Sequence, residues 1–233
     1  MGRLTHYTLA ILTMAAAAHT SAQDGATALT QNYRTLLDNE QMQVVRVHYD
    51  PREELPVHDH SRYPTVYVYL SNSGPVRFSH DEAHPFVLTR RAVRAGWFRV
   101  SPGRIEKHTV VNPGPVASDF LRVECKQIAL GQIRSGFRYS EDVDLTKTSA
   151  TTDYSSPEMV IRRYVVTTGG VQRVTAEPQG KLLIAFTPAV VRERGEGDRT
   201  MAAGSVLWIG AKREFDLLPS GAEAAHVLEV QLK

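Results

Sequence analysis

The sequence has little cysteine and little excess charge. Its 233 residues include a single cysteine, Cys125, which excludes an intramolecular disulfide framework and a zinc cluster made of thiolates. Lys and Arg together number 27 against 25 Asp and Glu, so no surplus of positive charge favours nucleic acid as a partner. The chain also lacks a nucleophile elbow, a phosphate-binding loop and a dinucleotide-binding glycine fingerprint. These missing motifs exclude several common enzyme classes, and the composition is otherwise that of an ordinary globular protein.

Only one apolar run suggests a targeting segment. Residues 9–18 form an apolar stretch of ten residues that follows the positively charged Arg3. This length suits the core of a signal peptide and is short for a membrane-spanning helix, which needs about twenty residues. Small residues at Thr20 and Ala22 predict cleavage after Ala22. We therefore expect residues 1–22 to be a signal peptide, with a membrane anchor as the alternative, and a mature chain that is periplasmic or secreted and free of the membrane.

Alternating strand patterns dominate the rest of the chain. Helical periodicity is confined to residues 29–37, which we predict as a short helix or an irregular arm. Turn signals separate short alternating segments, and this spacing predicts an antiparallel sandwich or barrel. The first series of expected strands comprises residues 42–49, 65–70, 76–78, 86–89, 97–100, 109–111 and 120–124. The second series comprises residues 160–167, 181–186, 205–209, 214–218 and 227–232.

The two series of strands look like copies of each other. Gly96 and Gly204, which precede corresponding strands, are 108 residues apart, and the turn glycines Gly114 and Gly221 are 107 apart. A nearly constant offset predicts two related barrels, although two unrelated segments that share generic alternation remain the alternative. The expected organisation is a signal peptide at 1–22, an N-terminal barrel at 23–127, a polar linker or crossover at 128–157 and a C-terminal barrel at 158–233.

The strongest chemical signal is a pair of histidines, His58 and His60, separated by one residue. Side chains at i and i+2 of a strand point to the same face, so both imidazoles enter one space. Further along the chain, His108 supplies a third imidazole, and Glu106 supplies a carboxylate two residues before it. Three imidazoles with a carboxylate or an open position suit Fe, Mn, Ni or Zn. We predict one divalent metal ion at these four residues, with Glu54 or water as the alternative fourth ligand.

The spacing of these residues resembles that of the cupin superfamily. The histidine pair matches the first cupin motif, and the second motif is matched by Gly96, Pro102, His108 and Asn112. Thr65 stands where the first motif has a glutamate. A subset of small cupins without that glutamate is more similar still, over about residues 33–126.

This resemblance implies an all-β fold of two cupin-like β-barrels, a bicupin jelly roll, with the three histidines inside the N-terminal barrel. The C-terminal copy is expected to be degenerate and metal-free, because alignment on the turn glycines places Phe215 opposite His108. Tyr67 and Tyr69 share strand parity with Thr65 and should line the same cavity. They are the candidate catalytic residues, since a tyrosine hydroxyl can orient a substrate or a metal-bound water; a half-buried barrel wall is the alternative.

Two functions remain open. The first is an exported metal-dependent enzyme, either an oxidoreductase of the dioxygenase type or an isomerase, which acts on a small oxygenated molecule. The second is a non-catalytic binding or scaffold protein whose barrel holds a small ligand without turnover, with the histidines forming a hydrogen-bond network or a metal site. One of the arginines between residues 90 and 104 could hold an anionic substrate group, a solvated basic face being the alternative. A homodimer is the oligomer that the resemblance implies.

Overall fold

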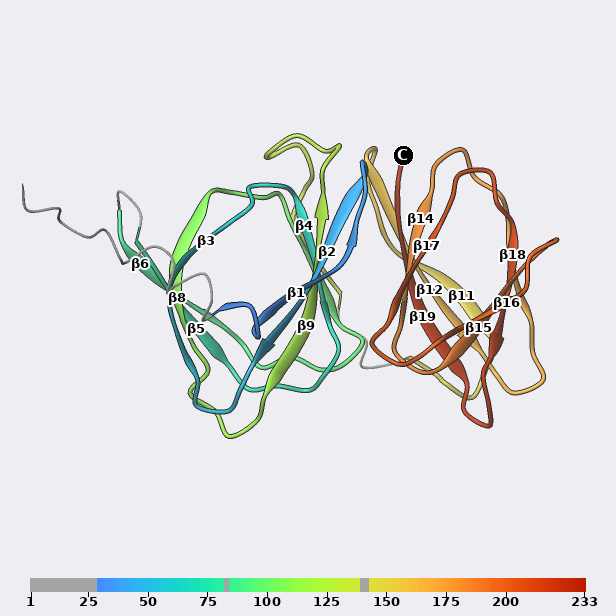
Figure 1. The fold of residues 1–233 in the computed structure, drawn as a ribbon, viewed down its shortest axis with the longest axis horizontal. Coiled ribbons are helices and arrows are strands. Elements are labelled where there is room, and N and C mark those ends of the chain that lie inside the picture. Colours follow the sequence, from blue (N-terminus) through green and yellow to red (C-terminus); the bar gives the residue numbers. More distant parts are fainter. Residues whose placement is uncertain (1–28, 82–83, 139–142) are drawn as a thin grey trace, which may run out of the picture.

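Antiparallel β-sheets make up the whole described architecture. The computed structural model describes residues 29–81, 84–138 and 143–233 (Figure 1), so the expected signal peptide at 1–22 lies outside the described residues. All of the elements from β1 to β19 are strands, and they form four sheets, which confirms the predicted all-β class. Within these ranges, no helix is long and apolar enough to span a bilayer.

The N-terminal half is a sandwich of a larger and a smaller sheet (Figure 1). The larger sheet has the order β1-β2-β9-β4-β7-β10, with bounds Tyr33–Asp38, Met42–Tyr49, Ser118–Cys125, Thr65–Tyr69, Phe98–Ser101 and Gly136–Arg138. The smaller sheet has the order β3-β8-β5-β6, with bounds Glu54–His60, Glu106–Val111, Val76–His80 and Phe86–Arg90. The two sheets are not closed into one barrel, so the predicted barrel is an open jelly-roll sandwich.

The C-terminal half repeats this arrangement strand by strand. Its larger sheet has the order β11-β12-β19-β14-β17, with bounds Ser149–Ser155, Met159–Val166, Ala225–Leu232, Lys181–Ala185 and Val206–Ile209. Its smaller sheet has the order β13-β18-β15-β16, with bounds Gln172–Val174, Phe215–Pro219, Ala189–Glu193 and Asp198–Met201. Each strand from β1 to β9 therefore has a counterpart whose label is higher by ten, so that β1 corresponds to β11 and β9 to β19.

The paired turn glycines lie at matching places in the two halves. Gly96 and Gly204 have φ angles of 87° and 75°, a region that favours glycine because other residues suffer a clash with Cβ there. The amide of Gly96 donates to the carbonyl of Tyr69 at 2.9 Å, and the amide of Gly204 donates to that of Ala185 at 2.7 Å. Tyr69 and Ala185 end the corresponding strands β4 and β14. The offset seen in the sequence therefore marks one structural repeat.

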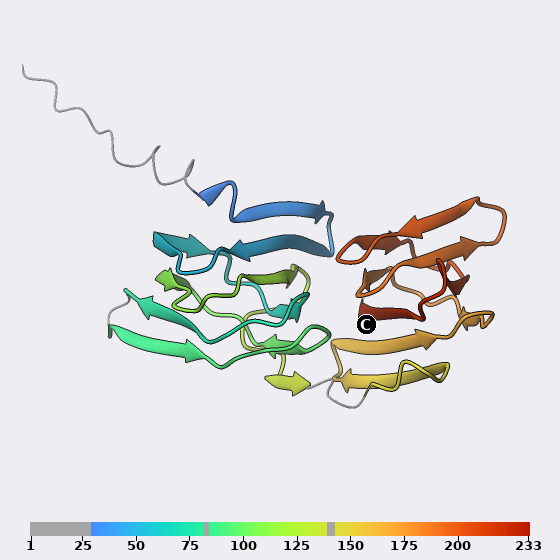
Figure 2. The same ribbon diagram turned by 90° about the horizontal axis from the view of Figure 1, so that it is seen from below.

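The two larger sheets pack against each other, so the halves share a hydrophobic core (Figure 2). Leu121 and Val123 of β9 lie in the same buried cluster as Leu228 and Val230 of β19. The central strands β9 and β19 therefore present apolar side chains on the face toward the other half. A fully buried aliphatic side chain contributes about 1.5–3 kcal/mol, so this interface is a main source of the stability of the molecule.

Two segments differ from the sequence-based expectations. Residues 128–157, expected as a polar linker, contribute Ile128 and Ile133 to the shared core and strands β10 and β11 to the sheet edges. An edge strand can be polar because only part of it is buried. The segment expected as a helix or arm contains strand β1, which pairs with β2 through an irregularity between Thr35 and Leu37. Pairing with a distant partner overrides the weak helical pattern there.

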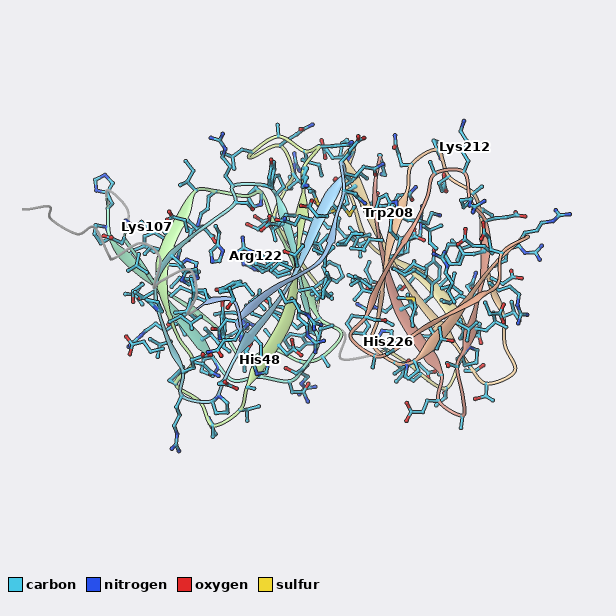
Figure 3. All side chains as sticks on the ribbon, viewed as in Figure 1. His48, Lys107, Arg122, Trp208, Lys212 and His226 are labelled. Carbon is cyan, nitrogen blue, oxygen red and sulfur yellow. The ribbon has the colours of Figure 1, made fainter. Side chains whose placement is uncertain are left out.

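A buried histidine lies at the junction of the two halves. His226, on the face of β19 that looks toward the N-terminal sandwich (Figure 3), accepts a hydrogen bond from Arg163 at 2.7 Å. A second nitrogen of Arg163 donates to the carbonyl of Gly96 in the other half at 2.9 Å. Burial, followed by the charge of Arg163, lowers the pKa of His226 to about 3. His226 is therefore neutral in the folded protein near neutral pH.

Lowering the pH from 7 to 5 should destabilise the protein through His226. Its folded-state pKa of about 3 lies below the unfolded value of about 6.5, so the unfolded chain takes up the proton first. Its contribution is complete above about pH 6.5 and is lost as the pH falls, by about 2 kcal/mol at pH 5. Urea unfolding of metal-free protein should show that His226→Gln, which keeps an acceptor for Arg163, removes this part of the pH dependence.

His48→Gln is the matched control, because His48 is a half-buried histidine of the same chain without a contact to Arg163, and its replacement should not remove the part of the pH dependence assigned to His226. If the free energy of unfolding changed with pH in the same way for the wild type and His226→Gln, the prediction would be contradicted.

Candidate functional site

Pairing of β3 with β8 brings the predicted histidines together. His58 lies directly opposite His108, and His60 lies opposite Glu106. The register shifts by one residue between Leu55 and His58, which is a β-bulge that turns the strand by one position. Both Leu55 and His58 therefore face the interior, whereas Glu54, predicted as an alternative fourth ligand, is exposed and points outward. Glu54 is thus no alternative ligand.

The three imidazoles form a compact triangle inside the N-terminal sandwich. Their ring centroids are 4.7 Å apart for His58 and His60, 5.1 Å for His58 and His108, and 4.9 Å for His60 and His108. One ring nitrogen from each lies within 4.8 Å of the others, and the Nε2 atoms of His60 and His108 are 3.1 Å apart. Two nitrogens that each lie about 2.1 Å from one ion would be roughly 3.0–3.4 Å apart. This donor set therefore fits one divalent ion.

Burial keeps these ligands in the form that binds a metal. Removal from water lowers the pKa values of His58, His60 and His108, in the last case to about 3. The positive charge of Arg122 lowers the pKa values further. A metal ion requires the neutral imidazole with a free lone pair. All three rings meet that requirement at neutral pH.

A tyrosine that the sequence analysis did not assign to the site fixes the orientation of His58. The Nδ1 atom of His58 lies 2.8 Å from the carbonyl of Pro56, and a carbonyl can only accept, so Nδ1 carries the proton. The Nε2 lone pair therefore points into the site, where it accepts from the hydroxyl of Tyr33 at 2.8 Å. The same hydroxyl lies 3.1 Å from that of Tyr49. Tyr33 thus occupies the lone pair that a metal ion would use.

Glu106 faces the same interior but lies outside the histidine triangle. Among the described residues, the group of potential ligands consists of the three histidines alone. The Oε1 atom of Glu106 instead accepts from Nε of Arg104 at 2.9 Å. The guanidinium of Arg104 also lies 2.8 Å from Nε2 of His80. His80 is buried at the end of β5, directly opposite His108, although its polar sequence context favours a solvated loop.

His60 and His108 open onto a cavity of about 170 Å³, whereas His58 lies outside its lining. Tyr67 and Tyr69 both line it, as their strand parity predicts, together with His60, His108 and Glu106. The other lining residues are Tyr49, Phe78, His80, Leu88, Arg90, Arg91, Arg99, Phe120 and Arg122. The cavity thus combines aromatic walls, two candidate metal ligands and several guanidinium groups.

Arg122 is a further candidate site residue that the sequence analysis did not identify. It lies on β9 inside the N-terminal sandwich (Figure 3), and only 4% of it is exposed. A signal existed in the sequence, because Phe120, Arg122 and Glu124 alternate with the apolar residues of the shared core. Charged residues at inward-facing positions of a strand are unusual.

The second sandwich has apolar side chains at the corresponding positions. Phe215 lies opposite Val174 on β13, as His108 lies opposite His58 on β3. Phe215 is buried in a core that also contains Leu183, Ala185 and Val227. The predicted correspondence between Phe215 and His108 is therefore confirmed by the strand register.

Comparison with known proteins reveals similarity at the level of structure. No protein-family model and no curated protein sequence matches this chain. A salicylate 1,2-dioxygenase from Pseudaminobacter salicylatoxidans is 11% identical with a TM-score of 0.59, over 90% of this chain and 80% of that one. AerE from Microcystis aeruginosa is 12% identical with a TM-score of 0.59, over 86% of this chain and 97% of that one.

A third similar structure is YhaK from Escherichia coli, which is 12% identical with a TM-score of 0.58, over 87% of this chain and 94% of that one. The salicylate dioxygenase has also been crystallised with gentisate. These proteins have the cupin fold, and so does this chain: it is a cupin-type jelly roll with a cluster of three histidines suited to a metal ion.

Replacing Tyr33 by phenylalanine should make metal binding tighter. Its hydrogen bond to His58 must break when an ion takes the lone pair, and such a bond contributes about 1 kcal/mol. Tyr33→Phe should therefore lower the free energy of unfolding of the metal-free protein by about 1 kcal/mol and tighten Zn²⁺ binding about fivefold. Competition with a chromophoric chelator measures the affinity.

The exposed tyrosine Tyr63 supplies the control, since Tyr63→Phe should change neither quantity. Weaker Zn²⁺ binding by Tyr33→Phe would contradict the prediction that the hydroxyl and the ion compete for the Nε2 lone pair of His58. It would instead indicate that the hydroxyl is itself a ligand.

Proposed function

We propose that this protein is a metal-dependent enzyme of the dioxygenase type that acts on a small oxygenated molecule. One divalent ion is held by the Nε2 atoms of His58, His60 and His108. The observation that supports this proposal most strongly is the convergence of three neutral imidazoles, with ring nitrogens within 4.8 Å of one another, beside a cavity that His60 and His108 line. The similarity in fold to a salicylate 1,2-dioxygenase favours oxygen chemistry over isomerisation.

The residues around the triangle have separate tasks in this proposal. When bound, a divalent ion supplies a Lewis acid for substrate oxygens and, if redox-active, electrons for dioxygen. The aromatic walls exclude water from the cavity. Burial raises the pKa of Tyr67, so its hydroxyl keeps its proton at neutral pH and can donate to a substrate oxygen. Tyr69 forms the adjacent wall, and Glu106, bridged to Arg104, is the carboxylate of the cavity lining that can accept a proton.

The proposed set of metal ligands can be tested by replacing one histidine with the residue found at its counterpart position. Phe215 takes the place of His108 in the second sandwich, so the sandwich can accommodate His108→Phe. Elemental analysis of protein purified without chelators should find about one ion per wild-type chain. His108→Phe should keep its unfolding midpoint without metal and lose at least about 90% of the bound ion, because two imidazoles bind far more weakly than three.

His48→Ala controls for adventitious binding at a half-buried histidine and should retain the full metal content. Equal metal content in the wild type and His108→Phe would exclude the triangle as the site.

The oxidative reaction requires its own measurement. Protein loaded anaerobically with Fe(II) or Mn(II) should consume oxygen in proportion to the loss of at least one compound in a panel of thiols, diketones and phenolic acids. His108→Phe and chelated protein should consume none, because both lack the ion. Absence of uptake with every compound, at full metal occupancy, would favour the alternative of a protein that binds a ligand without turnover.

The cellular location is part of the proposal. An apolar segment at residues 9–18 supports export of a mature chain that begins near Gln23. Cell fractionation of the tagged protein, with mass determination of its N-terminus, tests this expectation directly.

A further inference from the structure

Buried guanidinium groups line the cavity beside the histidine triangle. Arg122 is 4% exposed, and the carboxylate of Glu124 lies 3.3 Å from the Nη2 atom of Arg122. Its Nε atom has no hydrogen-bond partner within the described ranges. An arginine donates up to five hydrogen bonds and stays charged under all ordinary conditions. Arg122 therefore carries donor capacity that the protein itself does not satisfy.

Two further arginines repeat this pattern. The Nη2 atom of Arg90 donates to the hydroxyls of Ser73 at 2.9 Å and Ser118 at 3.0 Å, which fixes the side chain. The Nε and Nη1 atoms of Arg90 are buried, and no partner for them lies in the described part of the chain. The Nε atom of Arg99 is buried and unpaired in the same way. Such groups are costly to leave unpaired, by about 1–3 kcal/mol each or more for charged groups.

The strand register gathers these charges around one tyrosine. Tyr67 pairs with Arg122 on one side and with Arg99 on the other. The guanidinium carbon of Arg99 lies 4.3 Å from the centre of the Tyr67 ring, and that of Arg122 lies 5.6 Å from it. Glu106 is the one carboxylate among the cavity-lining residues, and it already binds Arg104. The cavity lining thus carries more guanidinium groups than carboxylates, even with Glu124 beside Arg122.

The remaining walls restrict the shape of a ligand. Tyr49, Tyr69, Phe78 and Phe120 line the cavity, and aromatic faces prefer a flat partner in offset or edge contact. The volume of about 170 Å³ is close to the roughly 150 Å³ that accommodates a benzene molecule. The space therefore suits one planar ring with a small substituent.

We propose that the cavity binds a small planar carboxylate, with the anionic group held by the unpaired donors of Arg90, Arg99 and Arg122 and the ring between the aromatic walls. This inference names the substrate class of the proposed dioxygenase and rests on it for turnover. Binding itself requires the arginines and not the metal, so the two proposals can fail separately. A carboxylate also neutralises the charge that Arg122 presents to the histidine triangle.

The test compares three compounds of similar size by isothermal titration calorimetry, with chelator-treated protein and with Zn²⁺-loaded protein. Benzoate is planar and anionic, benzamide is planar and neutral, and cyclohexanecarboxylate is anionic and not planar. Benzoate should bind at least about tenfold more tightly than benzamide, because a hydrogen bond to a charged group is about twice as strong as a neutral one. It should also bind at least about tenfold more tightly than cyclohexanecarboxylate, because the aromatic walls prefer a flat ring. Equal binding of benzoate and benzamide would overturn the proposal.

Variants assign the effect to the arginines. Arg99→Gln, at a half-buried position, and Arg122→Gln should each weaken benzoate binding about 10- to 100-fold. Arg94→Gln removes an exposed arginine that does not line the cavity and should have no effect. Circular dichroism checks that each variant is folded. If Arg122→Gln unfolds, Arg99→Gln decides, and unchanged benzoate affinity in that folded variant overturns the proposal.

Metal content of the same samples separates the two hypotheses. A protein that holds one ion but no benzoate retains the proposed metal site and loses the carboxylate subsite. A protein that binds benzoate but no ion retains the carboxylate subsite and lacks the proposed metal site.

Discussion

The pairing of β3 with β8 is the constraint on which the site depends. His58 and His108 come from distant parts of the chain, and they face each other because the two strands pair in one register. Side chains in a strand alternate between faces, so a slip of one residue would send the histidines to the outside. The bulge between Leu55 and His58 inserts one extra residue into β3. In a regular strand these two side chains would point to opposite faces, and with the bulge both Leu55 and His58 are directed inward.

Burial determines the chemistry of the site in two ways. It keeps the three imidazoles neutral, which favours a metal ion, and it leaves the guanidinium of Arg122 with an unpaired donor. A cation beside a metal site is unfavourable unless an anion lies between them. The arginines and the neutral histidines are therefore parts of one arrangement, in which an anionic ligand would balance the charge of the arginines and of an ion held by the histidines.

The two sandwiches share a strand order but differ in what fills them. Leu183, Ala185 and Val227 occupy the positions that Tyr67, Tyr69 and Phe120 occupy in the first sandwich, as the matching strand registers show. The smaller residues belong to a packed core around Phe215, whereas the larger ones line a cavity. Their larger sheets pack together, so the second sandwich supports the sheet that carries Tyr67, Arg99 and Arg122.

The sequence by itself determined the strand-rich class, the internal repeat and the three histidines, because alternation and residue spacing are local properties. It also placed Tyr67 and Tyr69 on one face. It did not determine the strand nature of β1, the outward direction of Glu54 or the presence of Arg122 and Tyr33 in the site. These features depend on strand pairing, on a bulge and on which face of β9 is covered. Only the tertiary structure decides them, since the partner of each group lies far away along the chain.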